Sequence, residues 1–329
     1  MVDSIPGRIG REVDGMADDT TEVSSNDLDL LHAMRSRNSQ SWRGFMRNRT
    51  GMAGMIIFLT FAALALLAPW IAPGNPSALT MNILIPPNSH YLLGTTAEGQ
   101  SVLMQTIWGT RSTLLVGLSA GALATLLSIF IGVGGAYSGG LMDDVSTLFS
   151  NIFIVIPGIP LMIVLTTYLH HAGLGAMILV IAFTGWPFGA RVLRSQTLSL
   201  RSRDFVRAAR LSGEGTWGVV RRELFPNMLS LIIANLLSTI MYAIGAEVSL
   251  QFLGLGNINT VSWGTMLYWA SNYQALLNGA WWWIIPPGIC IGLIGGALAL
   301  VNRSIDEISN PQLAIPGKPR KRRLRGESV

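Results

Sequence analysis

The sequence predicts an all-α membrane protein with six transmembrane helices. Half of its 329 residues are hydrophobic and 12% are charged, about half the charged fraction typical of soluble domains. Long stretches also contain no Asp, Glu, Lys or Arg, namely 50–97, 112–142, 145–190, 224–246 and 248–302. A soluble helical bundle built from such stretches would have no solvated face, so we reject that alternative.

The spans follow from the lengths of these stretches. A helix needs about 20 apolar residues to cross a hydrocarbon layer of about 30 Å. Residues 145–190 are long enough for two spans, one on each side of the polar turn that contains His170 and His171. The other stretches give one span each, at 52–72, 113–137, 228–250 and 280–302. Prolines at Pro157, Pro160 and Pro187 are expected to kink the third and fourth spans.

Two longer segments are expected outside the membrane. Residues 73–110 are rich in proline and are predicted to be extended. Residues 251–279 contain several turn-forming residues and a possible short amphipathic helix at 264–276. Trp281–Trp283 would mark the outer end of the last span, as an aromatic belt rather than a sugar-stacking platform.

The distribution of basic residues predicts the orientation in the membrane. With six spans and both termini in the cytoplasm, 22 of the 23 Lys and Arg residues are cytoplasmic, as the positive-inside rule requires. One inner turn is an exception, because it carries Asp143 and Asp144 without a basic residue. The predicted division of the chain is a largely disordered cytoplasmic tail (1–44), a six-helix domain (45–304) and a basic cytoplasmic tail (305–329). The basic stretches near both ends are expected to lie against anionic lipid rather than nucleic acid.

No catalytic or metal-binding pattern is evident in the sequence. The four histidines lack metal-ligand spacing, and His170–His171 reads as an interfacial turn. The sequence has no Gly-x-x-x-x-Gly-Lys-Ser/Thr phosphate loop. We therefore expect neither enzymatic activity nor a bound cofactor, and any energy for transport would come from another subunit.

A basic loop at 194–227 interrupts the apolar stretches. With Ser202 as N-cap, residues 203–212 can form a short helix that Gly213 ends in a left-handed turn. A second helix is predicted from Trp217 to Phe225, capped at Thr216, before Pro226 leads into the fifth span. The first helix would present one face composed of Phe205, Ala208, Ala209 and Ser212. Such a face is suited to docking in a cleft of another protein.

Glu247 is the ionisable residue of interest within the spans. A charge inside the membrane usually faces the bundle interior or water. Two alternatives remain open: Glu247 lines a translocation path together with Ser249, or it binds neighbouring backbone and the nearby external loop.

Three motifs within residues 40–312 resemble the second, C-type permease of the dipeptide/oligopeptide ABC importer family. The first is Leu-Gly-Thr-Thr-Ala-Glu-Gly-Gln-Ser-Val at 93–102, followed by Trp-Gly-Thr-Arg-Ser-Thr-Leu at 108–114. The second is the loop 204–227. The third is Glu-Val-Ser-Leu-Gln-Phe-Leu-Gly-Leu-Gly at 247–256, with Ser-Trp-Gly at 262–264.

This resemblance implies the type I permease fold of ABC importers. It also implies a bacterial inner-membrane subunit that forms half of a path for peptides. The expected partners are a homologous second permease, two ATPases that bind ATP and Mg, and an extracytoplasmic binding protein. The basic loop would couple to the ATPase through Asp204, Phe205, Arg207, Ala208, Ala209, Gly213 and Pro226. The external motif would include Gly94, Thr95, Gly99 and Arg111.

The sequence departs from the family pattern at two places. Thr96, Gln100 and Ser101 stand where Asp, Arg and Asp are usual, so oligosaccharides or nickel chelates remain alternative substrates. Arg207 stands where Glu is usual. An ion-coupled secondary transporter is the rival function from another class, although it would need several intramembrane charges. A non-transporting scaffold or receptor would leave the spacing of the basic loop unexplained.

Overall fold

The computed structural model describes residue 46 and residues 48–168 and 173–309. Its contacts separate residues 1–49 from Thr50–Val329, and the elements discussed below belong to the second unit, apart from the first residue of α2. The predicted tail 1–44, the His170–His171 turn and most of the predicted tail 305–329 lie outside the described residues.

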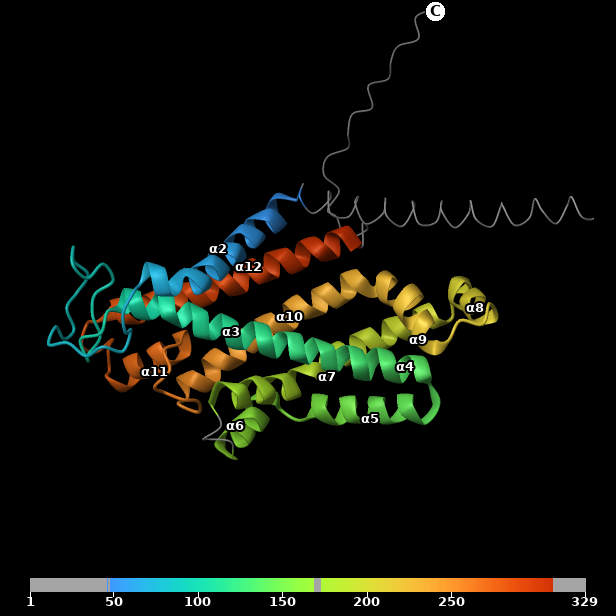
Figure 1. Ribbon diagram of the computed structural model, residues 1–329. Helices are drawn as coiled ribbons and strands as arrows, with labels where there is room; N and C mark the ends of the chain where they lie inside the picture. The colour runs from blue at the N-terminus through green and yellow to red at the C-terminus, as the bar shows by residue number, and fades with distance from the viewer. Residues whose placement is uncertain (1–45, 47, 169–172, 310–329) are drawn as a thin grey trace, which may run out of the picture. The chain divides into compact units, whose positions relative to one another are not determined.

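The described residues form helices, which Figure 1 shows in chain order. They are α2 (Arg49–Ile71), α3 (Val102–Ser128), the π-helix η1 (Ile129–Gly134), α4 (Gly135–Ser138), α5 (Gly140–Val155), α6 (Gly158–Tyr168), α7 (Gly173–Arg201), α8 (Asp204–Leu211), α9 (Thr216–Val219), the π-helix η2 (Val220–Leu224), α10 (Phe225–Phe252), α11 (Trp263–Asn272), the 3₁₀-helix η3 (Trp281–Trp283) and α12 (Ile285–Ser309). The long helices follow one another in the same order as the charge-free stretches of the sequence.

Five helical segments of the described chain are long and apolar enough to span a membrane, and a sixth span results if the bent pair α5–α6 is counted as one. The second span runs from Val102 to Ser138. The segment before it therefore ends at residue 101, and not at 110 as predicted. At the other end of the chain, α12 continues to Ser309, so the boundary predicted at 305 lies inside a helix.

The third span is broken rather than kinked, because α5 and α6 meet at an angle of 91°. Ile156 has φ −70° and ψ 126°, an extended conformation that the ring of the following Pro157 favours. Pro160 lies in the first turn of α6, where a missing N–H is tolerated. Pro187 lies inside α7, which continues on both sides of it.

The pair α3 and α10 forms the centre of the bundle. Gly117 and Gly121 of α3 face Ile244 and Ile240 of α10 so closely that an added Cβ would lie 2.3 Å and 2.6 Å from their side chains. Near this contact, the hydroxyl oxygens of Thr125 and Thr239 are 2.8 Å apart. Small residues thus bring two backbones together in a region without charges.

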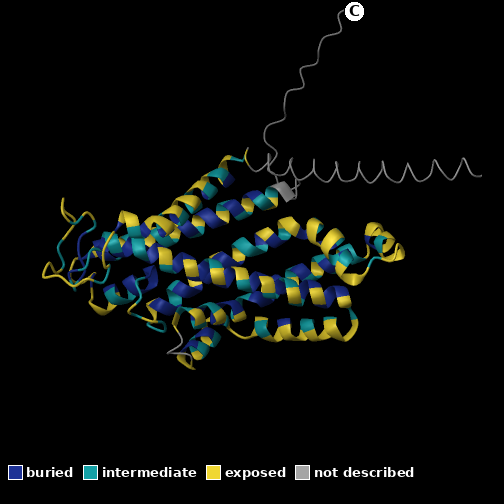
Figure 2. Cartoon of the chain, in the orientation of Figure 1, coloured by how far each residue is buried: buried dark blue, intermediate teal, exposed yellow. Residues whose placement is uncertain are grey.

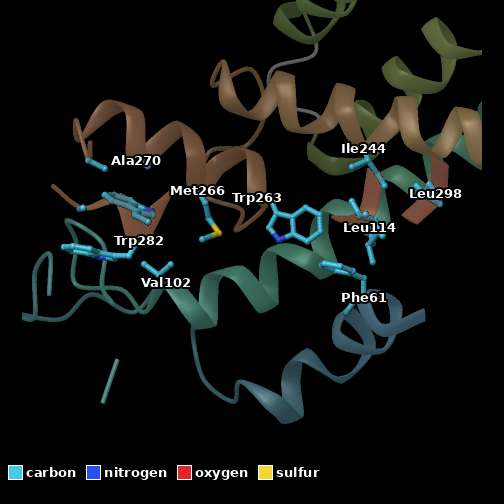
Figure 3. Close-up of a cluster of buried hydrophobic side chains, with 14 of the residues drawn as sticks. Phe61, Val102, Leu114, Ile244, Trp263, Met266, Ala270, Trp282 and Leu298 are labelled. Atoms are coloured by element: carbon cyan, nitrogen blue, oxygen red, sulfur yellow. The ribbon is translucent and has the colours of Figure 1, made fainter. Parts of the chain in front are cut away.

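Buried side chains gather in three clusters along the bundle, and Figure 2 shows buried residues on its inward faces. The first cluster surrounds Trp263, which Figure 3 shows between Phe61 of α2 and Met266 of α11. Trp282 and Trp283 belong to this cluster and are 8% and 2% exposed. The aromatic-belt prediction was therefore wrong for these two residues, whereas Trp281 is 53% exposed.

An ion pair accounts for Asp143, one of the two acidic residues that the orientation rule left unexplained. Asp143 of α5 accepts two hydrogen bonds from the guanidinium of Arg194 of α7, at 2.6 and 2.9 Å. This two-pronged geometry is the strongest form of such a pair. It connects the first half of the broken span to the neighbouring helix.

Candidate functional site

The basic loop folds as a helical elbow, defined here as residues 202–224. Figure 1 shows its helix α8 at one end of the bundle, with α11 and the segment before α3 at the opposite end. We call these the α8 end and the α11 end. Gly213 has φ +84°, which confirms the predicted left-handed turn after the first helix. The second helix begins at Thr216 and continues through η2 into α10 without a break.

The predicted caps of the elbow were wrong in detail. Arg203, not Ser202, occupies the N-cap position of α8, and the hydroxyl of Ser202 donates to the carbonyl oxygen of Ser199. Gly215 precedes the second helix in place of Thr216. Pro226 lies at the start of α10, directly after the π-helix η2, where its missing N–H interrupts the regular helical hydrogen bonds.

The elbow has an anchored face and a free face. Val206 is completely buried and Ala209 packs against the same cluster, near Tyr137 and Leu224. The predicted docking face therefore needs correction, because Ala209 points partly inward. The exposed apolar residues of the elbow are Leu211, Trp217, Phe205 and Ala208, of which Leu211 is 90% and Trp217 is 72% exposed.

The charged residues of the elbow divide in the same way. Arg210 lies over the ring of Tyr137 and donates to its hydroxyl at 3.1 Å. Arg222 donates to Glu214 at 2.9 Å. By contrast, Arg207 meets Asp204 at 4.0 Å and both side chains are exposed, so this pair adds little stability. The charge of Arg207 is consequently open to a partner.

A second candidate site is a polar stripe on α10. Asn235, Ser238, Tyr242 and Ser249 follow one another at helical spacing and are exposed or half-buried. The first three of them border a cavity of about 350 Å³ between α10, α7 and the break between α5 and α6. Phe153 and Phe188 supply aromatic walls, and none of the residues that line the cavity is charged. Gly185 of α7 makes room for the ring of Tyr242, which lies 3.0 Å from the position of a Cβ.

The two residues proposed for the translocation path point to different places. Ser249 lies on the polar stripe and donates to the carbonyl oxygen of Gly245. Glu247 is 1% exposed and faces away from the stripe. The hydroxyls of Thr113 and Ser262 are directed toward its carboxylate, although neither carboxylate oxygen has a hydrogen bond of standard geometry. This arrangement favours the alternative in which Glu247 binds the loop.

The carboxylate of Glu247 is placed where α11 begins. Ser262 is the N-cap of α11, and its side chain accepts from the backbone of Thr265 in a reciprocal capping box. The N–H of Trp263 donates to Thr113 at 3.4 Å. Both hydroxyls that face Glu247 thus hold backbone donors at a helix start, where a negative charge is favourable. Gly264 completes the contact, since a Cβ there would lie 2.5 Å from that of Gln251.

The motif before α3 has a structural role. Thr95 is completely buried, and its carbonyl oxygen accepts from the indole of Trp282 at 3.1 Å. Gly94 and Gly99 have φ +70° and +72°, and a Cβ on Gly99 would lie 2.1 Å from the carbonyl oxygen of Thr80. Arg111 lies over the ring of Trp108 at 5.8 Å. These residues fold the segment onto the first turns of α3.

The sequence analysis missed Asn235, Ser238 and Tyr242. Their signal was a row of polar residues at helical spacing inside a span without charges. The described residues contain no group of three His, Cys, Asp or Glu side chains that could hold a metal ion.

These features define a multi-pass helical membrane protein with a helical elbow at one end. Residues 124–314 match the family described as binding-protein-dependent transport system inner membrane component, and residues 36–87 match the N-terminal transmembrane domain of oligopeptide transport permease C. The chain belongs to this family of permeases, as the three motifs predicted.

Curated relatives are similar over most of their length. The chain is 31% identical over 283 residues to the dipeptide transport system permease protein DppC of Bacillus subtilis. The aligned region covers 84% of this chain and 87% of the relative. It is 30% identical to the di/tripeptide transport system permease protein DppC of Pseudomonas aeruginosa, over 83% of this chain and 91% of the relative. It is also 30% identical to the oligopeptide transport system permease protein OppC of Mycobacterium bovis, over 80% of this chain and 93% of the relative.

The position of Glu247 leads to a prediction about α11. Replacing Glu247 by Ala removes the buried carboxylate that the hydroxyls of Thr113 and Ser262 face at the start of the helix, so α11 should open more often. The probe is a cysteine in place of Ala270, which is fully buried in α11, in a Cys290→Ser background. Maleimide labelling of this cysteine should become severalfold faster with Glu247→Ala, and Ser249→Ala should leave it unchanged. Unchanged labelling together with lost transport in Glu247→Ala would instead assign Glu247 to the path.

Proposed function

We propose that this protein is the permease subunit of an ATP-driven importer and forms half of the path for dipeptides or oligopeptides delivered by an extracytoplasmic binding protein. Family membership carries the assignment to an importer, and the names of the relatives from Bacillus, Pseudomonas and Mycobacterium support peptides as the substrate. The other subunits would be a homologous permease and two ATPases. Lipid, and not nucleic acid, would surround the spans.

The chemistry of the cavity beside α10 is compatible with this substrate class. The amide of Asn235 and the hydroxyls of Ser238 and Tyr242 can exchange hydrogen bonds with peptide groups. The absence of charged residues from its lining would let peptides with different side chains pass. Oligosaccharides could use the same polar groups, and nickel chelates remain the third alternative.

This chain would contribute no ATP hydrolysis of its own. Its sequence lacks the phosphate loop that binds ATP in such transporters, so ATP and Mg would be bound by the partner ATPases. The elbow is the part of the chain suited to receive the movement of an ATPase. Its free face carries Phe205, Leu211 and Trp217 at the α8 end.

The α8 end would lie in the cytoplasm and the α11 end outside, in a bacterial inner membrane with both termini cytoplasmic. The asymmetry of basic residues supports this orientation. The cells are treated so that an impermeant maleimide reaches the outer face of the inner membrane but does not cross it. A cysteine replacing the exposed Ser89 should then react, whereas one replacing the exposed Ser199 should not. Labelling of the second position alone would reverse the orientation.

Two neighbouring alanines of the elbow separate docking from folding. Ala208 is exposed, so Ala208→Trp should leave thermal stability unchanged, prevent binding of the ATPases and abolish uptake by steric exclusion. Ala209 packs against the Val206 cluster, so Ala209→Trp should also lower the stability of the protein, by about 1–3 kcal/mol. The measurements are thermal unfolding, co-purification of the ATPases and uptake. Normal ATPase binding by Ala208→Trp would contradict the assignment of the elbow.

Reconstitution tests the substrate class. The complete importer in proteoliposomes, with its binding protein and internal ATP, should accumulate a radiolabelled tripeptide but neither maltotriose nor a nickel chelate. Asn235→Leu should lower peptide uptake severalfold, since it removes an amide from the wall of the cavity. Leu229→Ala is the control, because this exposed residue of α10 lies outside the cavity lining. Uptake of the sugar or the chelate in place of the peptide would reassign the substrate.

A further inference from the structure

Outside the spans, one carboxylate stands alone at the α11 end of the molecule. Glu98 is the only Asp, Glu, Lys or Arg in residues 72–101 and 253–281, which form the segments outside the spans at this end. None of the ion pairs in the described part of the chain includes Glu98. These two segments therefore carry a single charge, the Glu98 carboxylate, and the next basic residue along the chain, Arg111, lies over the ring of Trp108 in α3.

Glu98 lies in a polar pocket of about 290 Å³. The pocket is formed by the segment before α3, by the first turn of α3, by residues 258–261 and by α11. Gln100, Gln105 and Asn259 line it with amides, and Trp269 contributes an aromatic wall. The indole of Trp269 is held in place by donation to the carbonyl oxygen of Ile258 at 3.1 Å.

The carboxylate is fixed within this pocket by neutral donors. Its Oε1 accepts from the hydroxyl of Tyr273 at 2.9 Å, and its Oε2 accepts from Nε2 of Gln100 at 2.9 Å. The hydrogen bond to Glu98 raises the pKa of Tyr273, so the phenol remains a donor. Each carboxylate oxygen keeps a free lone pair. Glu98 is consequently oriented but its charge is not neutralised.

We propose that this pocket binds a lysine or arginine side chain of the binding protein that docks on the α11 end. A fixed carboxylate beside an aromatic wall is the complement of an ammonium or guanidinium group. The pocket shares no lining residue with the cavity beside α10, and all of its lining residues except Gln105 lie outside the spans. A protein docking on this end can therefore reach Glu98 without entering the bundle, which favours its side chain over the ammonium group of a transported peptide. This inference rests on the proposed function.

The test measures the affinity of the importer's own peptide-loaded binding protein for the complete complex in nanodiscs, at 50 and 300 mM NaCl. Glu98→Gln keeps the shape of the side chain and removes its charge. It should weaken binding roughly two- to fivefold at low salt, as expected for a partly exposed ion pair, and make the affinity less dependent on salt. Asn259→Asp adds a negative charge to the same pocket without removing a donor to Glu98, and it should strengthen binding at low salt. Gln274→Glu is the matched control, because it adds the same charge on the same end outside this pocket.

Three results would count against the assignment. Equal affinities of the wild type and both pocket variants would overturn it while leaving the proposed function intact. If Glu98→Gln left the affinity for the binding protein unchanged but abolished uptake only of peptides that contain lysine, the pocket would bind the transported peptide instead. Absence of any binding to the wild-type complex would overturn the proposed function and this assignment together.

Discussion

The close packing of α3 against α10 is the contact on which the rest of the molecule depends. Because these spans have almost no charged residues, their association relies on backbone proximity and on hydroxyl groups. Gly117 and Gly121 provide the proximity, and the Thr125–Thr239 contact adds a polar link. Further along the same pair, Thr113 of α3 and Glu247 of α10 meet the start of α11. The contact between α3 and α10 thus positions α11 as well as the two spans.

Helix α10 continues from its contact with α3 into the elbow without interruption. The segment Thr216–Phe252 contains 37 residues and is about 55 Å long at 1.5 Å per residue. It exceeds the thickness of a hydrocarbon layer of about 30 Å. The π-helix η2 lies where the elbow joins α10. Such wide turns are frequent at functional sites, and here one connects the anchored face of the elbow to the bundle.

The elements that depend on local sequence could be predicted, and those that depend on tertiary contacts could not. Charge-free stretches were sufficient for the spans, and Gly213 was sufficient for the left-handed turn. The 91° break at Pro157 could not be predicted, because proline in a span is compatible with a kink or with a break. The burial of Trp282 depends on Thr95 and Gly94, almost 190 residues earlier in the chain. The pairing of Asp143 with Arg194 is likewise a contact between distant helices.

The different roles of Glu247 and Ser249 could have been predicted from spacing alone. Residues two positions apart on a helix point to nearly opposite sides, so the two side chains could not both line one path. Asn235, Ser238 and Tyr242 share the side of Ser249, and together these four residues mark the polar stripe. The helical spacing of these neutral residues is visible in the sequence, although Glu247 is the only charged residue of α10.

The position of Glu247 also bears on how transport could be driven. It is the only charged residue between positions 224 and 302, so an ion-coupled mechanism in this half of the chain would have to use it. Its carboxylate is buried behind the capping residues of α11 and faces away from the cavity. Protonating it would disturb the start of α11 rather than the polar stripe. In the proposed function, the stripe would be moved from the other end, because a displacement of α8 and α9 would reach α10 through η2. The structure therefore favours a driving force applied at the elbow over one applied by an ion within the spans.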